Sequence, residues 1–334
     1  MFPTPSRRAS PTTDATIGIH AIGSGGGPLS TLTITRTDAT TVTLPDGGRN
    51  VDRDGNGVYD HPAGSLAEGL QTLVNGPDAI VLIRDGLRQT VVDLIQLASQ
   101  IEAGIDVNGD NIADLDANRI SYLGSSLGSM YGTGFVAVEP GVRAAILNTA
   151  GGPPVEVARL NAVGPFRGIL GKLLASRVPS LLNGGTVPGA IAIQDVLDRS
   201  EWAMKPSDPV AYAHYLRTDP LDDVATRPVL FTFGQGDPVV ANTTTAAILR
   251  AGNLADRTTY FRAVDAYAPT PPDAVAVHEF LLQFPTAGTP FATQAQQAIA
   301  TFLASDGQVT IDPDGDAPLF ETPIAGPLAG EQNP

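Results

Sequence analysis

The stretch that decides the fold is Arg119-Ile120-Ser121-Tyr122-Leu123-Gly124-Ser125-Ser126-Leu127-Gly128. Its first half has the apolar character of a short β-strand, and a helical stretch follows the second half. Between them, a Gly-x-Ser-x-Gly pattern holds a serine on a tight bend, because the flanking glycines remove side chains that would clash there. The pattern predicts Ser126 as a nucleophile whose Oγ is exposed above a sheet. Because the pentapeptide also arises by chance, a solvent-facing turn serine is the alternative.

Strands and helices alternate on both sides of this turn. Upstream, apolar residues recur at three- and four-residue steps over residues 85–101, which predicts an amphipathic helix. Such alternation predicts an α/β fold with a mostly parallel sheet flanked by helices. The other predicted strands are 15–22, 144–147, 228–233 and 259–264, and the last predicted helix covers 295–303.

Composition shifts divide the 334 residues into four segments. Residues 1–152 form the first part of the catalytic core, including the Asp-rich loops and the serine turn. Residues 153–226 break the alternation with Pro-, Gly- and Leu-rich segments and predict a helical cap. The core resumes over residues 227–305, and the Pro- and Asp-rich residues 306–334 predict a loose tail.

A serine nucleophile needs a general base, and His214 and His278 are the two histidines that follow Ser126. His278 comes after a predicted strand, where a loop can deliver its imidazole to the serine. His214 lies inside the predicted cap and is expected to pack or to line the entrance. Asp237 directly follows the strand 228–233 and is the predicted acid, in the order serine, acid, histidine; its alternative is a structural Asp-Pro turn. Asp265 and Asp273 are the reserve acids.

Four segments carry a resemblance to a known family: Arg88–Leu94, the Asp-rich loop before the serine turn, Gly124–Gly128 and Val138–Arg143. On these segments, residues 15–304 resemble the α/β-hydrolase superfamily, and more narrowly bacterial virulence-factor-type lipases and esterases. The resemblance implies hydrolysis of a carboxylic ester through an acyl-enzyme, with Ser126, Asp237 and His278 as the triad. It also implies an extracellular or cell-envelope location.

The oxyanion site is where the chain departs from the superfamily pattern. The first strand resembles the fourth of that fold, so an N-terminally shortened hydrolase is expected. The amide of Leu127 is then the predicted oxyanion donor. A second amide could come from the loop Gly23–Gly27, whose glycines allow close backbone approach, although a flexible loop is the simpler interpretation.

Two Asp-rich loops place oxygen side chains at positions 1, 3, 5 and 9, as in the first half of an EF-hand loop. Their sequences predict calcium as a structural ion, with acidic solvated turns as the alternative. Neither loop has the glutamate at position 12. The predicted ligands are Asp52, Asp54, Asn56 and Asp60 in the first loop, and Asp106, Asn108, Asp110 and Asp114 in the second.

The bulk composition limits the partners. Thirty-five acidic and twenty basic residues give a net charge of −15, which opposes binding to nucleic acid and to anionic lipid. The absence of cysteine excludes a thiolate nucleophile, and no apolar stretch predicts a membrane span or a secretion signal. A soluble protein is therefore expected. The apolar predicted cap suggests a hydrophobic acyl or aromatic ester as the substrate, for example a lipid or a polyester. A catalytically impaired binding protein and an acyltransferase with the same triad remain the alternatives.

Overall fold

The structure is a computed structural model. It describes residues 15–19, 21, 27–50, 57, 79–107, 109–162, 189–267, 276–283 and 291–325. Among these residues, none of the helices is both long and apolar enough to cross a lipid bilayer.

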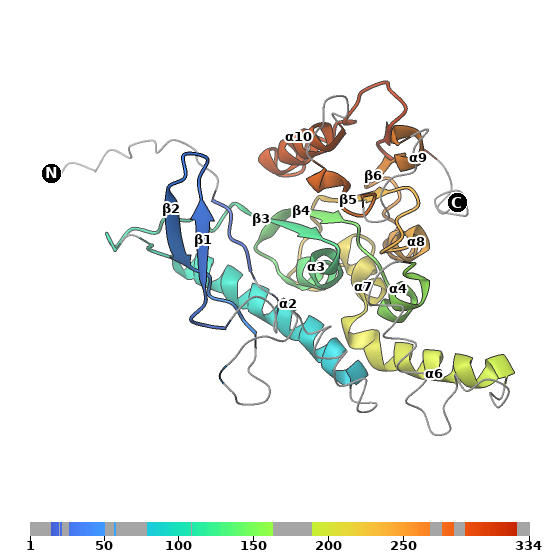
Figure 1. The fold of residues 1–334 in the computed structure, drawn as a ribbon. Coiled ribbons are helices and arrows are strands. Elements are labelled where there is room, and N and C mark those ends of the chain that lie inside the picture. The colour runs from blue at the N-terminus through green and yellow to red at the C-terminus, as the bar shows by residue number, and fades with distance from the viewer. Residues whose placement is uncertain are drawn as a thin grey trace.

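A five-stranded sheet forms the centre of the molecule, with the strands in sequence order (Figure 1). Four strands run parallel to their neighbours and the short fifth strand is antiparallel. The strands are β3 (Ile120–Ser125), β4 (Val142–Asn148), β5 (Val229–Gly234), β6 (Thr258–Phe261) and β7 (Phe320–Glu321). The predicted mostly parallel α/β sheet is therefore confirmed.

Helices cover both faces of this sheet. Successive residues of a central strand point to opposite faces, so each strand contributes side chains to the packing on both sides. On β4, Ile146 packs against α10 (Phe291–Ala304) through Ile299 and Phe302. The next residue, Leu147, belongs to the larger cluster on the other face. That cluster includes Phe135 of α3 (Leu127–Val138) and Leu249 of α8 (Asn242–Gly252). Both faces of the central strands are buried, as expected for a parallel sheet.

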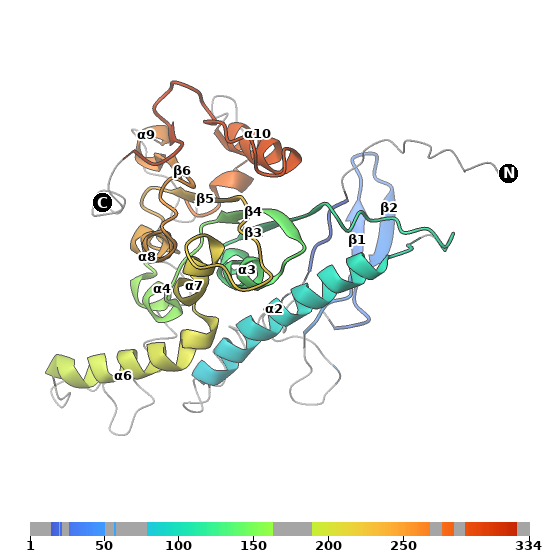
Figure 2. The ribbon, with the colours of Figure 1, turned by 180° about the vertical axis from the view of Figure 1, so that it is seen from behind.

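The predicted amphipathic helix is α2 (Ala79–Ala103), which packs against α3 and ends beside the strands β1 and β2 (Figure 2). The described part of segment 153–226, the predicted cap, is mostly helical up to Leu216. It contains α4 (Pro154–Leu160), α6 (Gly189–Met204), η1 (Lys205–Ser207), α7 (Pro209–Tyr212) and η2 (Ala213–Leu216). Leu197 and Met204 of α6 pack against Ile83 and Leu87 of α2, so the two long helices share an apolar contact.

Two expectations for the ends of the chain need correction. Residues 15–19, part of the expected strand 15–22, are not a strand, and of these residues only Ile19 packs against the core. The described N-terminal region instead forms an exposed antiparallel hairpin of β1 (Thr31–Thr35) and β2 (Thr41–Pro45). The first described strand of the main sheet is β3, whose outer edge is paired by no other described strand.

The segment expected to be loose is partly built into the core. Residues 306–325 carry β7, and the Phe320 side chain is buried and stacks on Phe261 of β6, with ring centroids 5.1 Å apart. The sequence predicted a loose segment because the residues around Phe320 are rich in Asp and Pro, a composition typical of loops.

Candidate active site

Ser126 lies on a sharp turn between β3 and α3, with backbone angles of φ 53° and ψ −117°. A left-handed φ is uncommon for a residue other than glycine and has to be held by the surrounding structure. The turn also requires glycine at position 124, since a Cβ there would lie 2.5 Å from the carbonyl oxygen of Gly128. The Gly-x-Ser-x-Gly sequence therefore forms the strained strand-to-helix turn that projects a serine side chain above a sheet.

The Ser126 backbone is anchored by the end of the neighbouring strand β4. Its N–H donates to the carbonyl oxygen of Asn148 at 2.9 Å and to the hydroxyl of Thr149 at 3.1 Å. Thr149 is fully buried and itself has a left-handed φ of 50°. Two residues with left-handed φ, each directly after one of two adjacent strands, are thus joined by a hydrogen bond. Sequence analysis missed Thr149.

His278 lies between Ser126 and Asp237 and reaches both. Its Nε2 is 2.8 Å from Oγ of Ser126, and its Nδ1 is 2.7 Å from Oδ2 of Asp237. The imidazole and the carboxyl group are both buried. The structure therefore brings together the serine, histidine and aspartate that the sequence singled out.

The other carboxylate oxygen of Asp237 is held by the loop after β5. Oδ1 accepts hydrogen bonds from the amides of Val239 at 2.8 Å and Val240 at 3.0 Å. Three donors, including the imidazole, fix the carboxyl group in one orientation. Asp237 is therefore both a turn-forming residue and the carboxylate that contacts His278, so the two hypotheses for this residue do not exclude each other.

Leu127 is the first residue of α3. Its amide is one of the helix N-terminal N–H groups that have no partner within the helix, and the helix dipole makes this end electropositive. The predicted oxyanion donor therefore lies next to the Ser126 side chain. Of the Gly23–Gly27 loop, Gly27 is described and the other four residues lie outside the described residues.

Asn148 is a second residue that sequence analysis missed. Its side chain donates to Oγ of Ser125 at 2.9 Å and accepts from the Thr232 hydroxyl at 2.7 Å. These bonds connect the ends of β3 and β4 with Thr232 of β5, next to the residue that precedes Ser126. A polar residue at the end of an otherwise apolar strand was the available signal, because buried polar groups usually have a defined partner.

Tyr122 supports the same turn from the strand side. Its hydroxyl donates to the carbonyl oxygen of Gly128 at 2.6 Å. Burial raises the pKa of Tyr122 and of Tyr131 above that of a free phenol, so both side chains stay neutral. Tyr122 is therefore a structural hydrogen-bond donor at physiological pH.

The remaining candidates lie elsewhere. The His214 ring packs against that of Tyr215, tilted by 41° with ring centroids 3.8 Å apart, which matches its expected packing role. The reserve acid Asp265 is on the short helix α9 (Ala263–Ala266) and pairs with Arg262 at 3.2 Å. Asp273 lies outside the described residues.

The predicted calcium loops are described only in part. Asp52, Asp54, Asn56 and Asp60 of the first loop, and Asn108 of the second, lie outside the described residues. In the second loop Asp106 accepts backbone N–H bonds from Gly109, Asp110 and Asn111, and Asp114 accepts one from Val107. Within the described ranges, no three His, Asp or Glu side chains gather as a metal site. Calcium binding stays a prediction, which a chelator-dependent melting temperature would test.

No family model matches this chain, and no curated protein matches it. Among solved structures it is similar to acetyl xylan esterase 1 from a Thermoanaerobacterium species, at 16% identity and a TM-score of 0.42, over 89% of this chain and 77% of that one. It is also similar to a puromycin-hydrolyzing peptidase of Mycobacterium tuberculosis, at 18% identity and a TM-score of 0.34. That match covers 68% of this chain but only 26% of the peptidase. Neither likeness identifies a substrate. The parallel sheet, the flanking helices and the serine turn between β3 and α3 make the fold α/β-hydrolase-like.

Proposed function

We propose that the protein is a serine hydrolase of carboxylic esters that works through an acyl-enzyme. The observation that carries this proposal is the placement of His278 between Oγ of Ser126 and the buried carboxyl group of Asp237. A serine hydroxyl is a weak nucleophile on its own and needs a base within hydrogen-bond reach. The base in turn needs a group that fixes its tautomer and stabilises its charged form.

In the proposed reaction, Oγ of Ser126 forms a bond to the ester carbonyl carbon while its proton passes to Nε2 of His278. Asp237 accepts a hydrogen bond from Nδ1–H of His278, stays ionised and stabilises the imidazolium. The negative charge that develops on the carbonyl oxygen is met by the N–H of Leu127 at the start of α3. The alcohol then leaves with the proton from Nε2, which gives the acyl-enzyme.

Deacylation repeats these steps with water as the nucleophile. Water loses its proton to Nε2, and its oxygen bonds to the acyl carbon. When the bond to Oγ of Ser126 breaks, the serine recovers its proton from His278 and the carboxylic acid is released. A second oxyanion donor would add about 2.7 to 4 kcal/mol of transition-state stabilisation.

The surroundings of the serine turn support an apolar acyl group. Leu127 and Tyr131, which follow Ser126 on α3, pack against an apolar cluster built from α2, α4 and α6. Leu127 also contacts a second cluster. Leu127 and Tyr131 are themselves only partly buried, so an apolar acyl group that packs against them would gain about 0.8 kcal/mol for each methylene it buries. The clusters consist of Ile83, Leu87, Val155, Leu197 and Met204, and of Met130, Val157 and Val240.

The test is hydrolysis of p-nitrophenyl esters of increasing acyl length by the wild type and by Ser126→Ala. We expect the wild type to prefer medium acyl chains over acetate, and Ser126→Ala to retain only the rate of uncatalysed hydrolysis. Ser121→Ala removes an exposed hydroxyl from β3, the strand that precedes Ser126, and should behave as the wild type. Equal rates for the wild type and Ser126→Ala would refute the proposal.

A further inference from the structure

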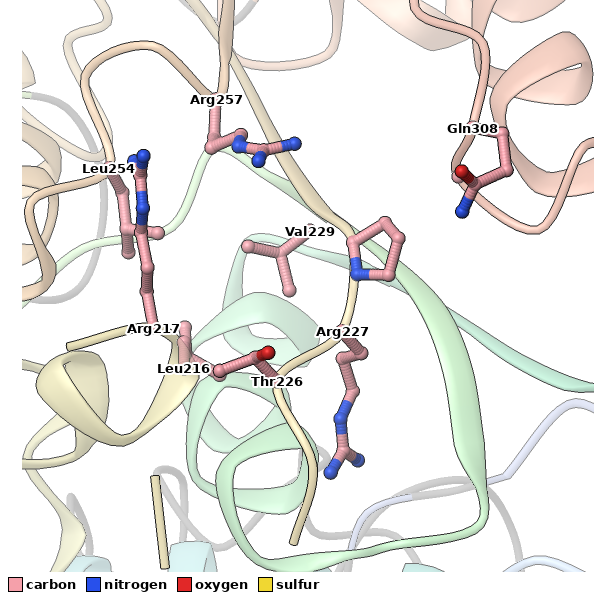
Figure 3. A pocket seen from close by; sticks show the side chains of 10 residues that line it. Leu216, Arg217, Thr226, Arg227, Val229, Leu254, Arg257 and Gln308 are labelled. Carbon is pink, nitrogen blue, oxygen red and sulfur yellow. The ribbon is translucent and has the colours of Figure 1, made fainter. Parts of the chain in front are cut away.

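Figure 3 shows a cleft of about 450 Å³ near the start of β5. Val229, the first residue of β5, forms part of its wall, whereas Asp237 follows the last residue of that strand. Leu254 lines the cleft just before β6 begins. Because parallel strands start at one edge of a sheet and end at the other, this cleft is separate from the candidate active site.

The cleft is positively charged in an acidic protein. Arg217, Arg227 and Arg257 all line it, and none of its ten lining residues is acidic. Figure 3 shows Arg217 and Arg257 on one side of the opening and Gln308 on the other. Asp256 pairs with Arg217 and with Arg257, and the charge of Glu139 acts on Arg227. The lining itself carries three cations and no anion, opposite in sign to the net charge of −15.

Arg257 keeps its hydrogen-bonding capacity available. Its Nε is 3.8 Å from Asp256, which is an ion pair but too long for a hydrogen bond. Asp256 is instead engaged by Nη1 of Arg217, which also donates to the carbonyl oxygen of Asn253 at 2.7 Å. Among the residues that the structure describes, the Arg257 guanidinium meets no acceptor at hydrogen-bond distance. Its planar fork is therefore free for a ligand.

Arg227 is half-buried, and its charge is compensated by carbonyl groups. Its guanidinium donates to the carbonyl oxygens of Glu139 and Ala225. Burial lowers the pKa of Arg227, and the nearby Glu139 charge acts in the opposite direction. A desolvated guanidinium bound mainly to neutral acceptors gains from an additional anion.

We propose that this cleft binds a small organic carboxylate. The Arg257 fork matches the planar geometry of a carboxylate, to which it can donate two parallel hydrogen bonds, and Arg217 and Arg227 add positive charge to the same lining. The other walls suit an apolar body, since Leu216, Pro228, Val229 and Leu254 line the same space. The volume is within the range of small-molecule sites. This site does not depend on the proposed esterase activity.

The test is calorimetric titration of the full chain with benzoate at constant ionic strength, with benzamide as the neutral isostere. We expect benzoate to bind and benzamide not to bind. Arg257→Gln should weaken benzoate binding about tenfold or more, because a charge-assisted hydrogen-bonded pair is lost. Arg199→Gln is the matched control, since it removes the same charge from an exposed ion pair on α6 and should leave the affinity unchanged.

Three outcomes would overturn the proposal. Equal binding of benzamide would show that the charge of the ligand is not recognised. Tighter binding of inorganic phosphate than of benzoate would replace the carboxylate class with phosphate. Loss of benzoate binding in His278→Ala, with retention in Arg257→Gln, would place the benzoate beside Ser126 instead. That last comparison needs no enzymatic activity, so it separates this proposal from the proposed function.

Discussion

Nδ1 of His278 lies 2.7 Å from Oδ2 of Asp237, although 41 residues separate them along the chain. This contact fixes which imidazole nitrogen carries the proton and leaves Nε2 directed at Ser126. The relationship makes Asp237 a positioning residue for the base and gives the first prediction.

Asp237→Asn should keep the fold but lower kcat about 1,000- to 10,000-fold, because an amide at this position favours the wrong histidine tautomer. Asp265→Asn is the control, since Asp265 pairs with Arg262 on α9. Steady-state kinetics on a p-nitrophenyl ester measures both. If Asp265→Asn lost activity and Asp237→Asn did not, the acid would be assigned wrongly.

Gly124→Ala should destabilise the protein by about 1 to 3 kcal/mol, as overpacked sites do. The new Cβ would lie 2.5 Å from the Gly128 carbonyl oxygen, which is backbone and cannot move aside cheaply. Gly18→Ala is the matched control, because nothing lies within 4 Å of a Cβ there. Urea unfolding measures both free energies, and equal stabilities would contradict the elbow geometry.

Thr149→Val should lower kcat about tenfold with little change in KM. The substitution keeps the shape but removes the hydroxyl that accepts the Ser126 N–H. Thr149→Ser restores that hydroxyl and should recover most of the rate, which a purely steric role for Thr149 would not predict. If Thr149→Ser were as slow as Thr149→Val, the hydroxyl would not be the important group.

Asp312 gives a prediction for the pH dependence of stability. Burial, followed by a hydrogen bond with Asp314, raises the pKa of Asp312 from 3.8 to about 6. Because the folded pKa is higher than the unfolded one, the associated stability is complete below about pH 4 and is lost as the pH rises through 6.

Asp312→Asn is neutral at every pH, so it should raise the melting temperature at pH 8 and have little effect at pH 4. Asp316→Asn, at an exposed position in the same turn, controls for the change in net charge. Calorimetry at both pH values provides the comparison. A variant less stable than the wild type at pH 8 would contradict the assigned direction.

The sequence predicted those features that depend on local pattern. The turn from Gly124 to Gly128 follows from backbone sterics, and the order of Ser126, Asp237 and His278 follows from where each comes after a strand. The buried strands and amphipathic helices were found because their apolar residues repeat with a regular period.

Features that depend on tertiary contacts were missed. Thr149 and Asn148 act through bonds to another strand, which no local pattern reveals. Phe320 is one aromatic anchor within a loop-like composition. The segment 15–19 shows the opposite error, because its apolar pattern is typical of a strand although Ile19 is its one residue packed against the core. An apolar segment becomes a strand only where a neighbouring strand is available to pair with it.

Labelling with a fluorophosphonate, followed by peptide mass mapping, tests the central claim most directly. The reagent bonds covalently to an activated serine, so we predict one adduct, located on Ser126. The adduct should be absent from Ser126→Ala and present in Ser121→Ala. An unlabelled wild-type protein, or an adduct that persists in Ser126→Ala, would contradict the assignment of Ser126 as the nucleophile.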